Sequence, residues 1–137
     1  MKVPLKVLYA CQVLAQLGRT YGQSSLPHIE VLAEAESVPA NYLVQILNEL
    51  RTSGLVVSRR GKQGGYALRV PPEQITLAAV MEAVDGSVLM VPDTTNGEHA
   101  QAVAQIWKGM QATLKKQAEN VTVADLMRPN QVAMWHI

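Results

Sequence analysis

The chain has 137 residues, a length that suits one globular domain with at most one appended element. Hydrophobic residues make up 48% and charged residues 17%, so the chain can bury a core and is not intrinsically disordered. No apolar run approaches the roughly 20 residues of a membrane span, and no secretory signal is evident at the start. The single cysteine, Cys11, excludes an intrachain disulfide and an all-cysteine metal cage. We therefore expect a cytoplasmic protein without a membrane segment.

The formal net charge of +1 hides an uneven distribution. Residues 1–70 carry eight basic and four acidic side chains, whereas the remainder carries four basic and seven acidic ones. Between Leu50 and Pro72 there are five basic residues and no acidic one. Such a block predicts a surface directed at phosphate groups, although a solvated pair of basic strands would have the same composition.

Two helices are predicted at the start of the chain. Apolar residues recur at helical spacing over residues 5–17, and Gly18 and Gly22 are expected to end this helix. The next helix is predicted over His28 to Glu36. The preceding Ser24-Ser25-Leu26-Pro27 offers capping hydroxyls and a proline suited to a first helical turn.

A third helix is predicted from about Ala40 to Ser53, with Pro39 tolerated in its first turn. It is amphipathic. Its inner stripe consists of Leu43, Ile46, Leu47 and Leu50, and its outer face of Asn41, Tyr42, Gln45, Asn48 and Thr52. Gly54 suits the left-handed position beyond the end of this helix.

Two β-prone runs, 55–60 and 66–70, flank the glycine-rich segment 61–65 and predict a hairpin. Helix, turn, helix and a hairpin with a basic tip is the element order of a winged helix-turn-helix. The predicted fold is mostly α with a small β-hairpin wing, followed by a long C-terminal helix.

The second half is predicted to be helical again. Thr76 suits the cap of a helix that ends at Gly86, and residues 87–98 are predicted to form a loop. We expect residues 1–86 to be the winged helix-turn-helix domain, 99–120 a dimerisation helix, and 121–137 a short helix and a tail. Pro129 is expected to stop that short helix, which follows Thr122.

The long helix carries an apolar seam at the spacing of a coiled coil. The seam consists of Val103, Trp107, Met110 and Leu114. Such a seam packs either on its own domain or on a second copy of the chain. The second interpretation predicts a homodimer and a pseudo-palindromic operator.

The outer face of the third helix suits contacts with base edges. Asn41 and Gln45 lie four residues apart, and either amide can bond adenine in the major groove. Tyr42 could reach a phosphate or a thymine methyl group. The predicted wing adds Arg59, Arg60, Lys62 and Gln63 beside glycines that permit close approach to a phosphate chain or a minor groove. Without the wing, the helix face alone is equally explained as a solvated surface.

Three stretches, 41–47, 50–56 and 58–66, resemble the signature of the Rrf2 (IscR/NsrR/CymR-like) family of bacterial regulators. The similarity extends to Met1-Lys2-Val3, Tyr9-Ala10, Ile75-Thr76-Leu77 and Val84-Asp85-Gly86. It covers about residues 1–86 well and the long helix by position only. The wing motif Arg-Gly-x-x-Gly-Gly-Tyr is its most specific part.

The resemblance implies a homodimeric DNA-binding repressor or activator, with the third helix in the major groove and the wing in the minor groove. By position it assigns base and backbone reading to Asn41, Tyr42 and Gln45, the wing arginine to Arg60, and phosphate contacts to Lys6 and Arg51. Cluster-binding members carry three cysteines before the long helix, but residues 87–100 contain none. Thiolates hold nearly all iron–sulfur clusters. Asp93, Glu98 and His99 are therefore a poor substitute, and we expect no cofactor and no metal site.

Cys11 falls on the core-facing side of the first helix, where a buried thiol is expected; a redox switch is the alternative. The three histidines are scattered, and no catalytic constellation is present, so we expect no enzyme. The leading interpretation is a dimeric, sequence-specific regulator of transcription, a repressor. The activity of this regulator is expected to be controlled by a small effector, by a regulatory protein or by its own abundance alone. The alternative is a winged-helix module that binds another protein and not DNA.

Overall fold

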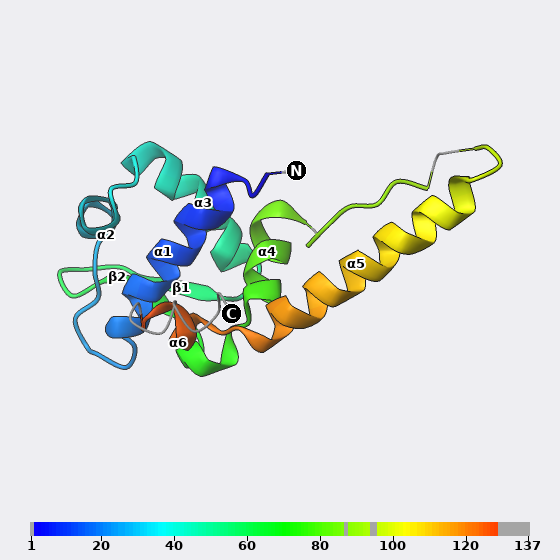
Figure 1. The fold of residues 1–137 in the computed structure, drawn as a ribbon. Helices are drawn as coiled ribbons and strands as arrows, with labels where there is room; N and C mark the ends of the chain where they lie inside the picture. Colours follow the sequence, from blue (N-terminus) through cyan, green and yellow to red (C-terminus); the bar gives the residue numbers. More distant parts are fainter. Residues whose placement is uncertain (1, 87, 94–95, 129–137) are drawn as a thin grey trace.

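The computed structural model describes residues 2–86, 88–93 and 96–128 (Figure 1). The elements in chain order are α1 (Leu5–Arg19), α2 (Ile29–Glu36), α3 (Ala40–Thr52), β1 (Val56–Arg59), β2 (Gly65–Leu68), the 3₁₀ turn η1 (Pro72–Gln74), α4 (Leu77–Asp85), α5 (Ala100–Asn120) and α6 (Val123–Leu126). The predicted fold, mostly helical with a two-stranded antiparallel hairpin, is confirmed. Met1, Ser87, Pro129 and the predicted C-terminal tail lie outside the described residues. No helix in the described ranges is both long and apolar enough to cross a membrane.

Helix α1 forms the centre of the winged-helix domain and is packed against α2, α3, α4, α6 and β2. Its Val13, Leu14 and Leu17 are fully buried, as are Leu43 and Leu47 on the inner stripe of α3. Burial of each such side chain is worth about 1.5–3 kcal/mol. This shared core fixes the orientation of α3, so the opposite face of α3 is held towards solvent.

The first helix is longer than predicted because Gly18 does not end it. Gly18 is buried inside α1, which continues to Arg19. A Cβ atom at Gly18 would overlap the sulfur of Met127, so the glycine provides space for the C-terminal segment to pack on α1. Gly22, with a φ of +84°, lies in the loop beyond the helix.

The expected role of Pro27 in the first turn of α2 is wrong. The N-cap residue of α2 is His28, without a side-chain cap, and Pro27 lies outside the helix. The carbonyl of Pro27 accepts a hydrogen bond from the amide of Tyr66 at 3.0 Å, and the amide of Leu26 donates to the carbonyl of Gln63 at 3.2 Å. The loop between α1 and α2 therefore holds the turn end of the hairpin, a tertiary role that outweighs helix capping.

Local signals at other boundaries are confirmed. Gly54 adopts a φ of +80° beyond α3, and Gly86 a φ of +84° after α4. The hydroxyl of Thr76 accepts a hydrogen bond from the amide of Ala79 at 3.1 Å. The expected place of Pro39 in the first turn of α3 is wrong by one position, because Pro39 is the N-cap residue that precedes this turn.

The described part of the loop after α4 leads away from the domain, and α5 runs back beside it to the domain (Figure 1). Asp93 in this loop pairs with Lys108 at 3.0 Å, and the Gln111 side chain donates to the carbonyl of Leu89. After α5, the amide of Val123 donates to the carbonyl of Ile75 at 2.9 Å, which returns the chain to the domain. Helix α6 then packs on α1.

Candidate nucleic-acid interface

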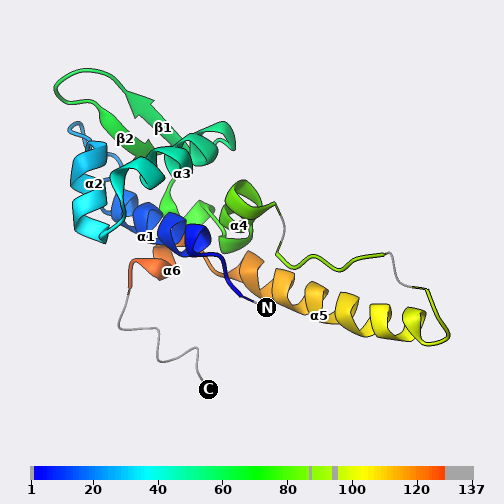
Figure 2. The same ribbon diagram turned by 90° about the horizontal axis from the view of Figure 1, so that it is seen from above.

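The hairpin and α3 occupy the same edge of the molecule, away from α6 (Figure 2). Strand β1 follows α3 after a short turn, in which the amide of Leu55 donates to the carbonyl of Leu50 at 2.9 Å. The strands pair in the register Val56↔Leu68 to Arg59↔Gly65. Val56 and Leu68 are buried in the same core as the inner stripe of α3. The two elements are thus parts of one packed unit.

The outer face of α3 presents amide side chains to solvent. Asn41, Gln45 and Asn48 are exposed, and Val44 beside them is 43% exposed. Val44 was not among the predicted site residues, although its position three residues after Asn41 puts it on the same face. The exposed face therefore combines hydrogen-bonding groups with one apolar side chain.

Tyr42 is less exposed than the sequence pattern suggests. Its ring packs edge-on against Tyr9 of α1, with ring centroids 5.6 Å apart and an interplanar angle of 77°. Such a contact adds about 0.5–1.5 kcal/mol to the burial of the rings. Tyr42 therefore anchors the start of α3 to α1 as well as bordering the outer face.

Arg51 connects α3 to the hairpin. Its guanidinium donates to the hydroxyl of Ser58 on β1 at 3.4 Å and to the side-chain oxygen of Asn48 at 3.3 Å. Both are weak, exposed bonds, so they direct the guanidinium across the gap between the two elements without neutralising it. The role of Ser58 was missed because nothing local in the sequence pairs it with Arg51.

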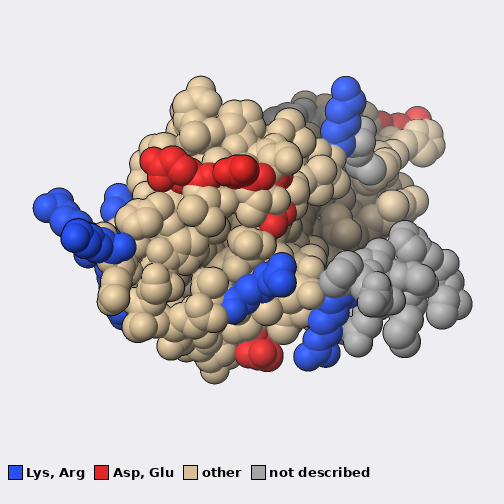
Figure 3. All heavy atoms as spheres, turned by 90° about the vertical axis from the view of Figure 1, so that its left-hand side faces the viewer, with Lys and Arg blue, Asp and Glu red and all other residues tan. Residues whose placement is uncertain are grey.

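The basic side chains of the wing are exposed. Arg59 lies at the end of β1, and Arg60, Lys62 and Gln63 lie in the turn that follows. In Figure 3 a group of basic side chains projects from one edge, a row of acidic side chains lies nearer the centre, and further basic side chains stand singly elsewhere on this face. The basic group at the edge can approach phosphates.

Two consecutive glycines determine the shape of the wing. A Cβ atom at Gly64 would lie 2.6 Å from the carbonyl carbon of Arg60, and one at Gly65 would lie 2.7 Å from that of Pro27. Gly65 also has a φ of +146°, which side chains other than glycine rarely adopt. The glycines of the wing motif therefore bring two backbone segments into contact.

Lys6 is not free in the structure. Its ammonium group pairs with the Glu49 carboxylate at 2.5 Å, and the two side chains are 28% and 38% exposed. The pair joins α1 to the inner edge of α3. The other carboxylate oxygen of Glu49 is buried and has no hydrogen-bond partner among the described residues. The expected phosphate contact of Lys6 would require this ammonium to leave or share its carboxylate.

The seam of α5 is exposed to solvent. Val103 is 52%, Trp107 39%, Met110 51% and Leu114 42% exposed, and Ile106 beside them is 66% exposed. Ala118 is the only buried residue that α5 contributes. The described part of the domain therefore does not cover the seam.

The donors for a metal site are dispersed. Within residues 2–86, 88–93 and 96–128, no group of three or more His, Cys, Asp and Glu side chains could hold a metal ion. Burial raises the pKa of the Cys11 thiol to about 11, so it remains protonated at neutral pH. Asp93 is engaged with Lys108.

Comparisons with known proteins agree with this geometry. Residues 5–129 match the Rrf2 family, described as an iron-dependent transcriptional regulator. CymR of Bacillus subtilis, an HTH-type transcriptional regulator, is 27% identical over 92% of this chain and 89% of its own length. IscR of Vibrio campbellii, of the same description, is 28% identical over 96% of this chain and 80% of its own.

Solved structures show the same fold. The structure of the B. subtilis CymR, titled the global cysteine regulator, has a TM-score of 0.80 and 26% identity, and it covers 93% of this chain and 96% of that one. The family description names iron; the residues present do not fit an iron–sulfur cluster, which takes thiolate ligands, because the chain has one cysteine, on α1. With a family match over nearly its whole length and an exposed helix beside a basic wing, the chain belongs to the Rrf2 family and is a DNA-binding transcriptional regulator, not an enzyme.

Proposed function

We propose that the protein is a dimeric, sequence-specific repressor that acts by occupying a pseudo-palindromic operator, without an iron–sulfur cluster. The observation that supports it best is the rigid placement of the α3 amides beside the basic wing. The core that Val56 and Leu68 share with the inner stripe of α3, and the short turn closed by the Leu55–Leu50 hydrogen bond, keep these surfaces together. A duplex can then meet both at once.

Affinity and specificity come from different side chains. Arg51, Arg59 and Lys62 neutralise phosphates, which makes binding dependent on salt. Asn41 and Gln45 form hydrogen bonds with base edges in the major groove, and each good pair contributes about 1–3 kcal/mol of discrimination. Arg60 enters the minor groove from the wing. Tyr42 and Gln63 contribute contacts with the DNA backbone at the edges of this surface, whereas Lys6 stays paired with Glu49.

A second copy of the chain covers the α5 seam. A 21-residue helix with a single buried residue gains little stability from its own domain, and isolated helices are marginal in water. Apolar side chains along one face of α5, including Ile106, supply the missing burial across a two-fold axis. The symmetry places two α3 helices about one turn of DNA apart.

We propose that the signal is not a change in an iron–sulfur cluster. Residues 87–100, the stretch that corresponds to the cysteine-bearing loop of cluster-binding members, contain no cysteine. Repression is therefore controlled by an effector, a regulatory protein or abundance, and not by cluster loss.

The DNA test begins with selection of bound fragments from a random duplex pool. The selected operator and a scrambled duplex are then titrated at several salt concentrations. We expect an inverted repeat, tighter binding to the operator, and a steep fall in affinity with salt. Equal, weak and salt-insensitive binding to both duplexes would favour the alternative, a winged-helix module that binds another protein. A template whose promoter contains the operator tests repression, because the bound protein should reduce its transcription.

The dimer test compares two charge insertions on α5. Met110→Glu places a carboxylate in the seam, whereas Gln105→Glu places one on an exposed position outside it. In sedimentation experiments we expect wild type and Gln105→Glu to be dimers and Met110→Glu to shift towards monomer. A monomeric wild type at micromolar concentration would contradict the dimer.

A further inference from the structure

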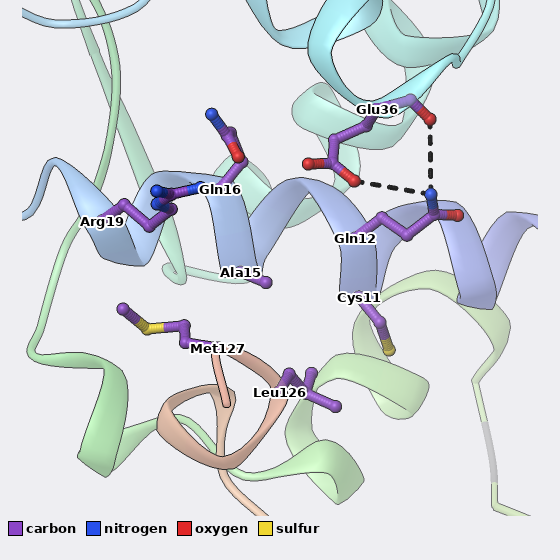
Figure 4. A pocket seen from close by; sticks show the side chains of 8 residues that line it. All are labelled: Cys11, Gln12, Ala15, Gln16, Arg19, Glu36, Leu126 and Met127. Atoms are coloured by element: carbon purple, nitrogen blue, oxygen red, sulfur yellow. Dashed lines mark hydrogen bonds between the residues drawn. The ribbon is translucent and has the colours of Figure 1, made fainter. Parts of the chain in front are cut away.

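An open pocket of about 340 Å³ lies on the side of α1 away from the wing, between the end of α2 and α6. Figure 4 shows Arg19 towards one end of this pocket, Glu36 towards the other, and Gln16 between them. Leu126 and Met127 of the α6 segment face Ala15 across the pocket. The site thus has one positive end, one negative end and an apolar wall.

The two charged groups are available to a ligand. In the described part of the chain, neither Arg19 nor Glu36 forms an ion pair. Among the described side chains, only the Gln12 amide donates hydrogen bonds to Glu36, at 3.4 Å to the Glu36 carboxylate and at 3.3 Å to the Glu36 backbone carbonyl. The Cys11 thiol adds no charge at neutral pH. A pocket with one free cation and one free anion suits a small molecule that carries both charges.

We propose that this pocket binds a short zwitterion of dipeptide length, with its ammonium group at Glu36 and its carboxylate at Arg19. Its apolar side chain lies on Ala15, Leu126 and Met127. That this zwitterion regulates DNA binding rests on the proposed function. That it binds the pocket does not.

The backbone separation of the two ends gives the scale of the ligand. Gln12, which contacts Glu36, and Arg19 are seven residues apart on α1, or about 10.5 Å along its axis. An extended dipeptide spans up to about 7 Å, and a charged hydrogen bond of about 2.8 Å at each end extends its reach to about 12–13 Å. A free amino acid carries the same two charges but reaches only about 9 Å when it is counted in the same way.

The position of the pocket connects it to the DNA-binding surface. Glu36 is the last residue of α2, and Ser37 after it adopts a left-handed φ of +55° in the turn that leads to α3. Met127 packs over Gly18, and α6 follows α5 directly. A ligand that joins α2 to α6 through α1 therefore couples the turn before α3 to the end of the long helix.

Calorimetry with the dipeptide Gly-Leu and the full-length protein, without DNA, tests the site. N-acetyl-Gly-Leu lacks the ammonium, Gly-Leu-amide lacks the carboxylate, and free leucine is the shorter zwitterion. We expect saturable binding of Gly-Leu and affinities at least about tenfold lower for the two blocked peptides, because each loses a charged hydrogen bond. Equal or tighter binding of free leucine would support recognition of both charges but contradict a ligand of dipeptide length.

Matched variants assign the two ends. Glu36→Gln should weaken Gly-Leu binding about tenfold and abolish its preference over the acetylated peptide, and Arg19→Gln should abolish its preference over the amide. Glu30→Gln makes the same change on α2 outside the pocket and should bind as wild type does. No saturable heat with any zwitterion, or equal binding of the blocked peptides, would overturn the site.

Fluorescence anisotropy with a labelled operator separates the two proposals. A change in DNA affinity on addition of Gly-Leu to wild type, but not to Glu36→Gln, supports the regulatory role. Peptide binding without any change in DNA affinity overturns that role. If the protein does not bind DNA at all, the proposed function fails while the calorimetric result remains valid.

Discussion

Replacement of Gly65 by alanine tests whether the contact between the α1–α2 loop and the wing holds the hairpin in place. The added Cβ atom would lie 2.7 Å from the carbonyl carbon of Pro27 and 2.8 Å from the carbonyl oxygen of Leu26. Backbone atoms cannot rotate away as a flexible side chain can. The loop must therefore separate from β2, or Gly65 must change conformation.

The expected loss of stability has two parts. A side chain at a φ of +146° adds backbone strain of about 1–3 kcal/mol. Separation of the loop also breaks the Tyr66–Pro27 and Leu26–Gln63 hydrogen bonds, each worth about 1 kcal/mol net. We expect Gly65→Ala to lower the free energy of unfolding by about 3–5 kcal/mol.

Gly61→Ala provides the matched control. Gly61 has a φ of +103°, but a Cβ atom there would meet nothing within 4 Å. Urea denaturation should therefore show a loss of about 1–3 kcal/mol for this variant, from strain alone. The difference between the two variants, about 2 kcal/mol, measures the loop–wing contact. Equal losses for Gly61→Ala and Gly65→Ala would refute the role assigned to Pro27.

Other substitutions test the DNA-binding surface and the thiol. Lys62→Ala should reduce the slope of log affinity against log salt by about one unit on every duplex. Lys6→Gln should leave that slope unchanged and lower stability instead, because Lys6 pairs with Glu49; a slope change equal to that of Lys62→Ala would show that Lys6 binds phosphate. Gln45→Ala should relax preference at one base pair by about 1–3 kcal/mol, and equal losses on operator and scrambled DNA would contradict base reading by Gln45. Because burial raises the pKa of Cys11 to about 11, iodoacetamide should label the folded protein slowly at mildly alkaline pH and rapidly after denaturation. Rapid labelling of the folded state would restore the redox alternative.

Much of the fold could be predicted from short-range patterns. Apolar spacing predicts the three helices before the wing, and Gly54, Thr76 and Gly86 mark boundaries that the structure confirms. These signals succeed because a helix and its caps depend on residues within a few positions of one another. The exposed amides of α3 follow from the same periodicity, since burial of one stripe exposes the opposite one.

Tertiary contacts decided the rest. Gly18 lies inside α1, where the lack of a Cβ atom leaves room for the Met127 side chain. Pro27 binds the wing through its carbonyl and does not start α2. Lys6 is paired with Glu49, 43 residues away, although its charge alone suits a phosphate. Each outcome depends on a partner far along the chain, which no local pattern of apolar and polar residues encodes. The amino-acid order therefore determined which helices and strands form, and the packing around α1 determined which of their side chains are left to meet DNA.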